Sequence, residues 1–225
     1  MDRIRVDLHV HSRSSPDSTL TLGAIADQLG LVGLQGFALT DHNTVVSHAA
    51  LRELNRKYPR LWFLPGIEVS TQEGHLLVYG VSELPPIYRP LADTLDWIRD
   101  RGGVSVLAHP LRWSHGVGRR IAESAPVAAI EAVNGHNSTL ANARAEVIAA
   151  RRAIGSTGGS DAHELLDLGR AYTEFPGEVD SLDDLLEALR HGRVSGAGNS
   201  LTGFARARLA FRTTLRRLGR GLRPI

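Results

Sequence analysis

The sequence predicts an α/β domain whose parallel sheet closes, or nearly closes, into a small barrel. Short runs of β-branched and apolar residues alternate along the chain with longer segments of helical periodicity, a pattern typical of a parallel sheet covered by helices. The chain has 225 residues, of which 42% are apolar, which suits one domain with a substantial core. Seven or eight such units fill roughly the first 190 residues, so a barrel fits better than two lobes.

The individual elements follow from two kinds of sequence pattern, one typical of strands and one typical of helices. The strand-like runs are short and rich in apolar or β-branched residues, and they cover residues 4–10, 36–40, 61–69, 76–80, 104–108, 128–133 and 154–160, with 171–175 as an eighth candidate. Helical spacing of apolar residues occurs at residues 21–31, 44–57, 90–101, 139–153 and 181–191. A strand followed by a helix therefore recurs along the body of the chain.

The charge is unevenly distributed. The formal net charge is +2, from 26 Lys and Arg against 24 Asp and Glu. Residues 195–225 contain no acidic residue and seven arginines: Arg206, Arg208, Arg212, Arg216, Arg217, Arg220 and Arg223. This leaves 19 basic against 24 acidic residues, a net charge of −5, in the rest of the chain. We therefore expect a barrel domain at residues 1–198 and a basic amphipathic tail at residues 199–225.

The tail has three interpretations. Its apolar residues alternate with the arginines, and they are Leu209, Phe211, Leu215, Leu218 and Leu222. Such a segment can contact nucleic acid, lie on an anionic membrane surface, or pack against the acidic body or a second subunit. No aromatic stacking platform accompanies the arginines, which argues against single-stranded nucleic acid in particular.

Composition excludes several classes of function. The chain has no Cys, which excludes thiol nucleophiles, iron–sulfur clusters, thiolate zinc sites and disulfides, so any metal would be held by nitrogen and oxygen. Ten His residues are more than a chain of this size usually carries. No stretch approaches the roughly 18 apolar residues that span a bilayer, and no cleavable leader precedes the first strand. We therefore expect a cytoplasmic protein without a membrane span.

Polar residues gather at the ends of the predicted strands. They are His9 and His11 at the end of the first strand, Asp41 and His42 at the end of the second, Glu68 at the end of the third, His109 after the fifth, and Asp161 and His163 after the seventh. In a parallel barrel these ends open on one face, where active sites of this architecture are assembled. Residues two apart in a strand share a side, so the His9 and His11 rings can bind one ion while Asp7 accepts a ring N–H.

Taken together, these motifs resemble the PHP (polymerase and histidinol phosphatase) family, especially its stand-alone phosphoesterases. The order is Asp-x-His-x-His from Asp7, then Thr-Asp-His, Gly-Ile-Glu, Gly-His at His75, Ala-His-Pro and Gly-Ser-Asp-Ala-His ending at His163. The resemblance implies a distorted (β/α)7 barrel with two or three divalent ions, Mn, Zn or Fe, at the C-terminal strand ends. It also implies hydrolysis of phosphate esters.

The resemblance also implies a ligand set for three neighbouring ions. His9, His11, Glu68 and Asp161 would hold the first, Glu68 with His75 and His109 the second, and Asp17, His42 and His163 the third. Asp17 stands where some relatives have His, an exchange that a hard ion tolerates. Asp7, Asp41 and Glu131 would orient the ligand imidazoles. His48, His115 and His191 receive no role in the site.

Such a cluster can hydrolyse a phosphomonoester or nucleotide-type ester without a protein nucleophile. Two ions roughly 3.5–4 Å apart would lower the pKa of a bridging water toward about 7, so that hydroxide attacks the phosphorus. Arg112 and Arg13 can fork N–H donors onto phosphate oxygens, and Asn134 and His136 can face the substrate. The Gly-rich segment 113–120 is either a mobile lid or an ordinary loop.

Two alternatives belong to other classes. The first is a metal-stabilised module that binds nucleic acid or protein through its basic tail and does not act on a small phosphorylated substrate. The complete ligand set argues against this alternative. The second retains the metal cluster but cleaves a C–N bond, since a metal-activated hydroxide is common to both reactions.

Overall fold

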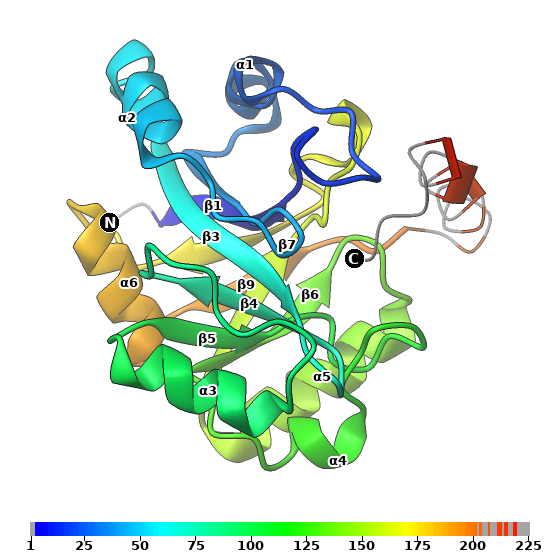
Figure 1. Ribbon diagram of the computed structural model, residues 1–225. Coiled ribbons are helices and arrows are strands. Elements are labelled where there is room, and N and C mark those ends of the chain that lie inside the picture. Colours follow the sequence, from blue (N-terminus) through cyan, green and yellow to red (C-terminus); the bar gives the residue numbers. More distant parts are fainter. Residues whose placement is uncertain are drawn as a thin grey trace.

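The computed structural model describes residues 3–201 together with 203, 207, 211–212, 214–215 and 218–219. Its strands are β1 (Ile4–Val10), β2 (Gly36–Leu39), β3 (Trp62–Ser70), β4 (His75–Tyr79), β5 (Val104–Leu107), β6 (Ala129–Asn134), β7 (Gly155–Gly159), β8 (Ala171–Phe175) and β9 (Ser195–Gly198). Its helices are α1 (Leu22–Val32), α2 (His48–Lys57), α3 (Leu91–Asp100), α4 (Arg119–Ala122), α5 (Thr139–Arg152) and α6 (Leu182–Arg190), with a 3-10 turn, η1 (Leu165–Asp167). Figure 1 shows the strands wrapped around a common centre with the helices outside.

The expected α/β barrel is confirmed, but its sheet is mixed. The nine strands follow the order β7-β6-β5-β4-β3-β2-β1-β8-β9. Strands β1 to β3 are parallel, as are β5 to β7, whereas β4 runs antiparallel to both of its neighbours. Only residues 71–74 connect β3 to β4, too few for the crossover that a parallel neighbour requires. On the other side of β1, β8 and β9 are also antiparallel to their neighbours.

The barrel nearly closes where β7 approaches β1. The amide of Asp161 donates to the His9 carbonyl at 2.8 Å, and the amide of His11 donates to the Ala162 carbonyl at 3.0 Å. Glycine makes this approach possible, because a Cβ on Gly159 would lie 2.4 Å from the Cβ of His9, and one on Gly158 2.2 Å from a backbone oxygen of β8. The closure brings the end of the seventh strand against the end of the first.

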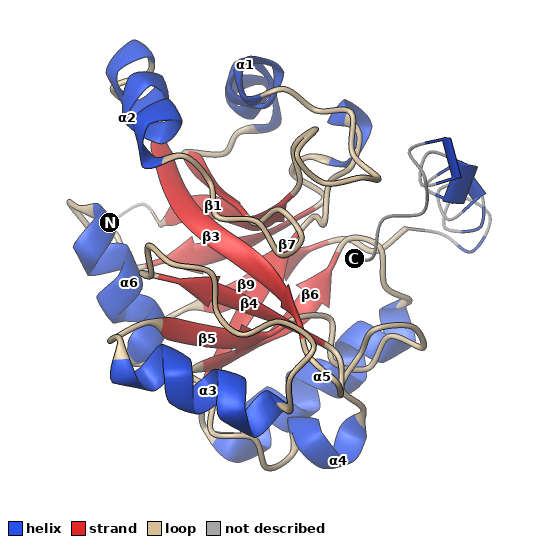
Figure 2. Cartoon of the chain, viewed as in Figure 1, coloured by secondary structure: helices blue, strands red, loops and turns tan. Residues whose placement is uncertain are grey.

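The helices bury apolar faces against the outside of the barrel (Figures 1 and 2). Helices α1 and α2 cover β2 and β3 through a cluster that includes Ile25, Leu29 and Phe63. On the opposite side, α3 and α5 cover β4 and β6. Ser or Thr side chains accept amide hydrogens at the starts of α1, α2, α5 and α6, and these N-caps explain where those helices begin.

Two elements were not expected from the sequence. β9 consists of Ser, Gly and Ala only and has none of the residues that mark a strand. Helix α4 begins at Arg119, within the last two residues of the segment predicted to be a loop or lid, and extends beyond it to Ala122. The predicted helix at 44–57 begins instead at residue 48, after its N-cap Ser47.

Little of the predicted tail lies within the described residues. Arg206, Arg208, Leu209, Arg216, Arg217, Arg220, Leu222 and Arg223 lie outside them. The boundary at residue 198 therefore stays a prediction. No helix in the described part of the chain is long and apolar enough to cross a membrane.

Candidate metal centre

Six histidines and three acids meet at one end of the barrel. All are at most 8% exposed, and they are His9, His11, His42, His75, His109, His163, Glu68, Asp17 and Asp161. Most follow strands that point toward this end, but His75 is the first residue of the antiparallel β4. An antiparallel strand thus contributes its N-terminal end to a site formed otherwise by C-terminal ends. His109 and Asp161 adopt positive φ angles of 28° and 57°, a conformation that clusters at functional sites.

The group expected to hold a first ion is closely packed. The Nε2 atoms of His9 and His11 lie 3.1 Å apart. Glu68 Oε2 lies 3.3 and 3.2 Å from these nitrogens, and Asp161 Oδ1 lies 3.6 and 3.3 Å from them. Four ligands about 2.0–2.2 Å from one ion are separated by roughly 3–3.6 Å. The four donor atoms therefore have the spacing of a coordination shell.

Glu68 lies at the centre of the site and uses both oxygens. Its Oε1 lies 2.7 Å from Nδ1 of His75 and 3.0 Å from Nε2 of His109, while its Oε2 lies 3.0 Å from Nδ1 of His42. Burial disfavours its charge, but the imidazoles of His42, His75 and His9 hold the pKa of Glu68 well below its usual range. One ionised carboxylate is thus shared between two sets of imidazoles.

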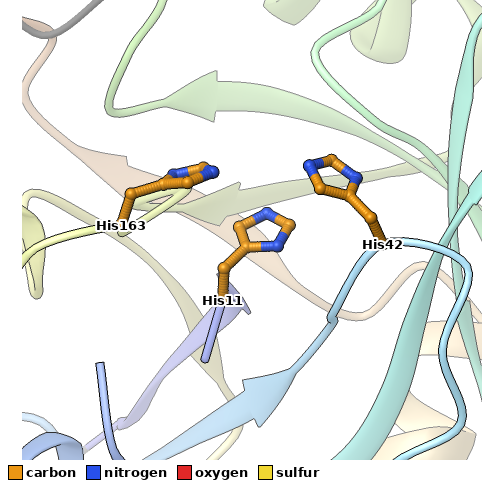
Figure 3. A group of neighbouring side chains, drawn as sticks. All are labelled: His11, His42 and His163. Carbon is orange, nitrogen blue, oxygen red and sulfur yellow. The ribbon is translucent and has the colours of Figure 1, made fainter. Parts of the chain in front are cut away.

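Figure 3 shows a third group, in which the rings of His11, His42 and His163 converge from three different segments. Asp17 joins them, with Oδ2 3.5 Å from Nε2 of His42 and 3.2 Å from Nε2 of His163. The Nδ1 of His163 hydrogen-bonds the Asp161 carbonyl at 2.7 Å, which fixes the ring with Nε2 toward Asp17.

Two of the three acids expected to orient imidazoles do so. Glu131 Oε1 pairs with Nδ1 of His9 at 2.9 Å. Asp41 acts through Ser15, whose hydroxyl donates to Asp41 Oδ1 at 2.7 Å and lies 3.1 Å from Nδ1 of His11. Both contacts leave the Nε2 atoms of His9 and His11 directed at the shared donors.

Asp7, the third of these acids, contacts backbone amides and not an imidazole, contrary to the expectation. Its carboxylate accepts the backbone amides of His9 and Ser160 at 3.2 and 2.8 Å, and that of Gly169 at 3.4 Å. Burial raises the pKa of Asp7 to about 7, against the opposing effect of these hydrogen bonds. The short side chain reaches the amides beside it rather than an imidazole, so Asp7 ties the backbones of β1 and β7 together.

Three of the four expected substrate contacts lie beside the same cluster. Arg112 Nη2 donates to Asp161 Oδ2 and to Asn134 Oδ1, both at 2.6 Å. His136 Nδ1 lies 3.9 Å from Asp161 Oδ2. Arg13, by contrast, is exposed at the rim, in a cleft of about 550 Å³ between α1 and α2 that also borders Asp41.

Sequence reasoning missed His115. Its ring stacks on that of His75, with centroids 4.6 Å apart, and its carbonyl accepts the His75 amide at 2.9 Å. Burial lowers the pKa of His115 to about 4. The signal available was its place in a Gly-rich loop after the His109 strand end. His191, also set aside, lies on α6 next to Glu187, and the side chain of His48 is outside the described residues.

The donor set fits divalent ions. Several of its buried polar atoms form no well-aligned hydrogen bond among the described residues: Asp17 Oδ1, His42 Nδ1, Glu68 Oε2 and His163 Nε2. The last three lie close to another donor atom of the set. Each such atom costs about 1–3 kcal/mol when left unpaired. Imidazole and carboxylate donors in this number suit Mn, Fe or Zn ions, and coordination would satisfy several of these atoms.

Comparisons with known proteins agree with the fold and with the motifs. A family model described as PHP-associated matches residues 139–194. Two uncharacterised proteins of Methanocaldococcus jannaschii are similar: MJ1587 is 26% identical over 48% of this chain and 68% of its own length, and MJ0417 is 27% identical over 81% and 75%.

Three solved structures share the fold. PsfC from Pseudomonas syringae PB-5123 has a TM-score of 0.69 and 20% identity, covering 97% of this chain and 99% of that one. A provisionally assigned metal-dependent phosphoesterase from Bifidobacterium adolescentis has a TM-score of 0.62 and 18% identity, covering 83% and 96%. An amidohydrolase from Chromobacterium violaceum, solved with sulfate and no metal, has a TM-score of 0.60 and 21% identity, covering 82% and 96%. These comparisons agree with the resemblance that the motifs indicate: a family model described as PHP-associated matches one segment of a chain whose fold is shared by the three solved structures.

Proposed function

We propose that this chain is a metal-dependent hydrolase of phosphate esters, acting on a phosphomonoester or a nucleotide-type ester. The observation that carries the proposal is the position of Glu68, whose two carboxylate oxygens each face imidazoles of a different set. A carboxylate shared in this way can bridge two ions of a cluster. The similarity to a provisionally assigned metal-dependent phosphoesterase supports the same class of reaction.

The ions would be held by three neighbouring groups of side chains, of which the first two share Glu68: His9, His11, Glu68 and Asp161; Glu68, His75 and His109; and Asp17, His42 and His163. When bound, divalent ions lower the pKa of coordinated water and neutralise negative charge on the phosphoryl group. Glu131 and Ser15 already hold the rings of His9 and His11 in orientation.

Arg112 favours a phosphate ester over an amide. Its guanidinium is fixed by Asp161, Asn134 and Asn137, and its side chain keeps 24% exposure at the mouth of the cluster. A fixed guanidinium beside the ligands suits the equatorial oxygens of a phosphoryl group, which it binds through charge-assisted hydrogen bonds. An amide carries no such charge.

The test is hydrolysis by protein reconstituted with Mn or Zn. Release of inorganic phosphate from a panel of phosphomonoesters and nucleotides is expected, together with loss of release in Asp161→Asn. His191→Ala, an exposed histidine on α6, is the matched control and should retain both metal and activity. Hydrolysis of amide substrates alone, with metal bound, would replace the proposal with the C–N alternative, for which the amidohydrolase fold offers a precedent.

A further inference from the structure

The C-terminal segment carries an apolar stripe that the proposed hydrolase does not use. In the sequence, apolar residues recur every three or four positions, a spacing that places them on one face of a helix: Phe204, Ala207, Phe211, Leu215, Leu218 and Leu222. The same spacing places most of the seven arginines on the other faces, and no acidic residue falls within residues 195–225. The pattern therefore indicates a cationic amphipathic helix.

The described part of this segment agrees with that pattern. Its residues 203, 207, 211–212, 214–215 and 218–219 are helical, and they lie at the edge of the molecule in Figure 1. Phe211, Leu215 and Leu218 are 65%, 51% and 53% exposed. These three side chains of the stripe therefore face solvent instead of packing on the barrel.

A second exposed apolar feature lies beside it. Arg212 Nη1 forms an ion pair with Glu164 Oε2 at 2.9 Å. The next two residues, Leu165 and Leu166, are 40% and 75% exposed and line a shallow cavity of about 430 Å³ together with Arg212. The contact places the helical segment next to a loop that follows His163, on the side of the candidate metal centre.

We propose that this segment docks the protein on an anionic lipid surface. Helices of this composition lie in the membrane interface, with the apolar face in the acyl boundary and the arginines at the headgroups. The body of the chain has a net charge of −5, so a negatively charged surface attracts the segment and repels the rest.

Packing on the acidic body involves the contact between Arg212 and Glu164 in the described residues but leaves Phe211, Leu215 and Leu218 exposed. The two remaining occupants, a second copy and nucleic acid, each use only half of the segment. A second copy would cover the apolar stripe, but it would bring two sets of seven arginines together without an acidic residue between them. Nucleic acid would pair with the arginines through its phosphates, but it would leave Phe211, Leu215 and Leu218 in water. An anionic lipid surface satisfies both faces, and it is independent of the reaction that the metal centre performs.

The test is sedimentation of the full chain with vesicles. The protein is expected to pellet with vesicles of phosphatidylcholine and phosphatidylglycerol, to remain in solution with phosphatidylcholine alone, and to dissociate as salt is added. The variant Phe211→Ser, Leu215→Ser, Leu218→Ser should bind about tenfold more weakly or worse, because each methylene buried in the membrane contributes a factor of about four.

A matched control separates the stripe from exposed apolar surface in general. Leu31→Ser, Leu84→Ser and Val147→Ser together remove three side chains of the barrel that are 81%, 40% and 48% exposed, and this variant should bind vesicles like the unchanged chain. Equal thermal unfolding of both variants verifies that the barrel is folded.

Three results would overturn the proposal. One is no preference for the anionic vesicles. Another is binding to DNA or RNA that the three serines leave unchanged, without vesicle binding. The last is a dimer in sedimentation equilibrium that the serines convert to a monomer, again without vesicle binding.

Discussion

Replacing Glu68 by Gln removes the one charge that both imidazole sets of the proposed metal centre share. The substitution preserves shape, so packing around this 1% exposed residue is little changed. An amide offers one neutral oxygen where the carboxylate places one oxygen 2.7–3.0 Å from His75 and His109 and the other 3.0–3.3 Å from His9, His11 and His42. We therefore expect Glu68→Gln to weaken the first two ion sites together.

The magnitude follows from linkage between binding and folding. An ion present at 100 times its dissociation constant stabilises the folded state by about 2.7 kcal/mol. For a chain of this size each kcal/mol raises the Tm by about 2–4 °C, so one such ion should raise the Tm by roughly 5–11 °C. Glu68→Gln should lose most of this increase for the first two ions.

The assay is thermal unfolding of chelator-treated protein, with and without added Mn or Zn, together with elemental analysis of the bound metal. The matched control is Glu123→Gln, which removes an exposed carboxylate paired with Arg119 on the surface and should show the full metal-dependent shift. Equal metal content and an equal shift in Glu68→Gln and the unchanged chain would refute a bridging role for Glu68.

Three further substitutions test other parts of the site. Glu131→Gln should lower metal affinity about 10–100-fold while the protein stays folded, because it weakens the contact that orients His9; isothermal titration with Zn measures this, and an unchanged affinity contradicts it. Arg112→Ala should raise KM for a phosphate ester by about 10–100-fold with a smaller change in kcat, and steady-state kinetics that show only a kcat effect would exclude a binding role. Gly159→Ala should lower the free energy of unfolding by about 1–3 kcal/mol or more, since its Cβ would lie 2.4 Å from that of His9; urea unfolding compares it with Gly23→Ala on α1, where the added methyl meets nothing within 4 Å and should be neutral or stabilising.

Local patterning predicts the elements of this fold well where burial and periodicity coincide. The strand expected at residues 4–10 has those bounds, because its apolar residues are buried on the barrel side. Patterning fails for β9, whose small residues carry no strand signal, and for the direction of β4. Strand direction depends on how the sheet is connected in space, and the four-residue connection before β4 is too short for a parallel crossover.

For the candidate site, too, the sequence predicted some features and not others. The nine expected ligands do lie together, because they lie in strand ends, or in the loops that follow them, which meet at the same end of one barrel. The role of Asp7, by contrast, was wrong, and His115 was overlooked. The contacts of Asp7 and His115 depend on distances to atoms that are remote in sequence, and local patterning does not give these distances.

The sequence by itself determined the kind of chemistry open to this protein. Without Cys and with ten His, a metal cluster can have only nitrogen and oxygen ligands, and the motifs name the residues that supply them. The tertiary structure decided how these ligands are combined. The close approach of Gly159 to His9 nearly closes the barrel. This closure, which no local pattern predicts, brings Asp161 to His9 and His11. It leaves Glu68 between the two sets of imidazoles. Such contacts join residues as far apart as His9 and Asp161 in the sequence. They arise from sheet register and packing, which the periodicity of a single element does not reveal.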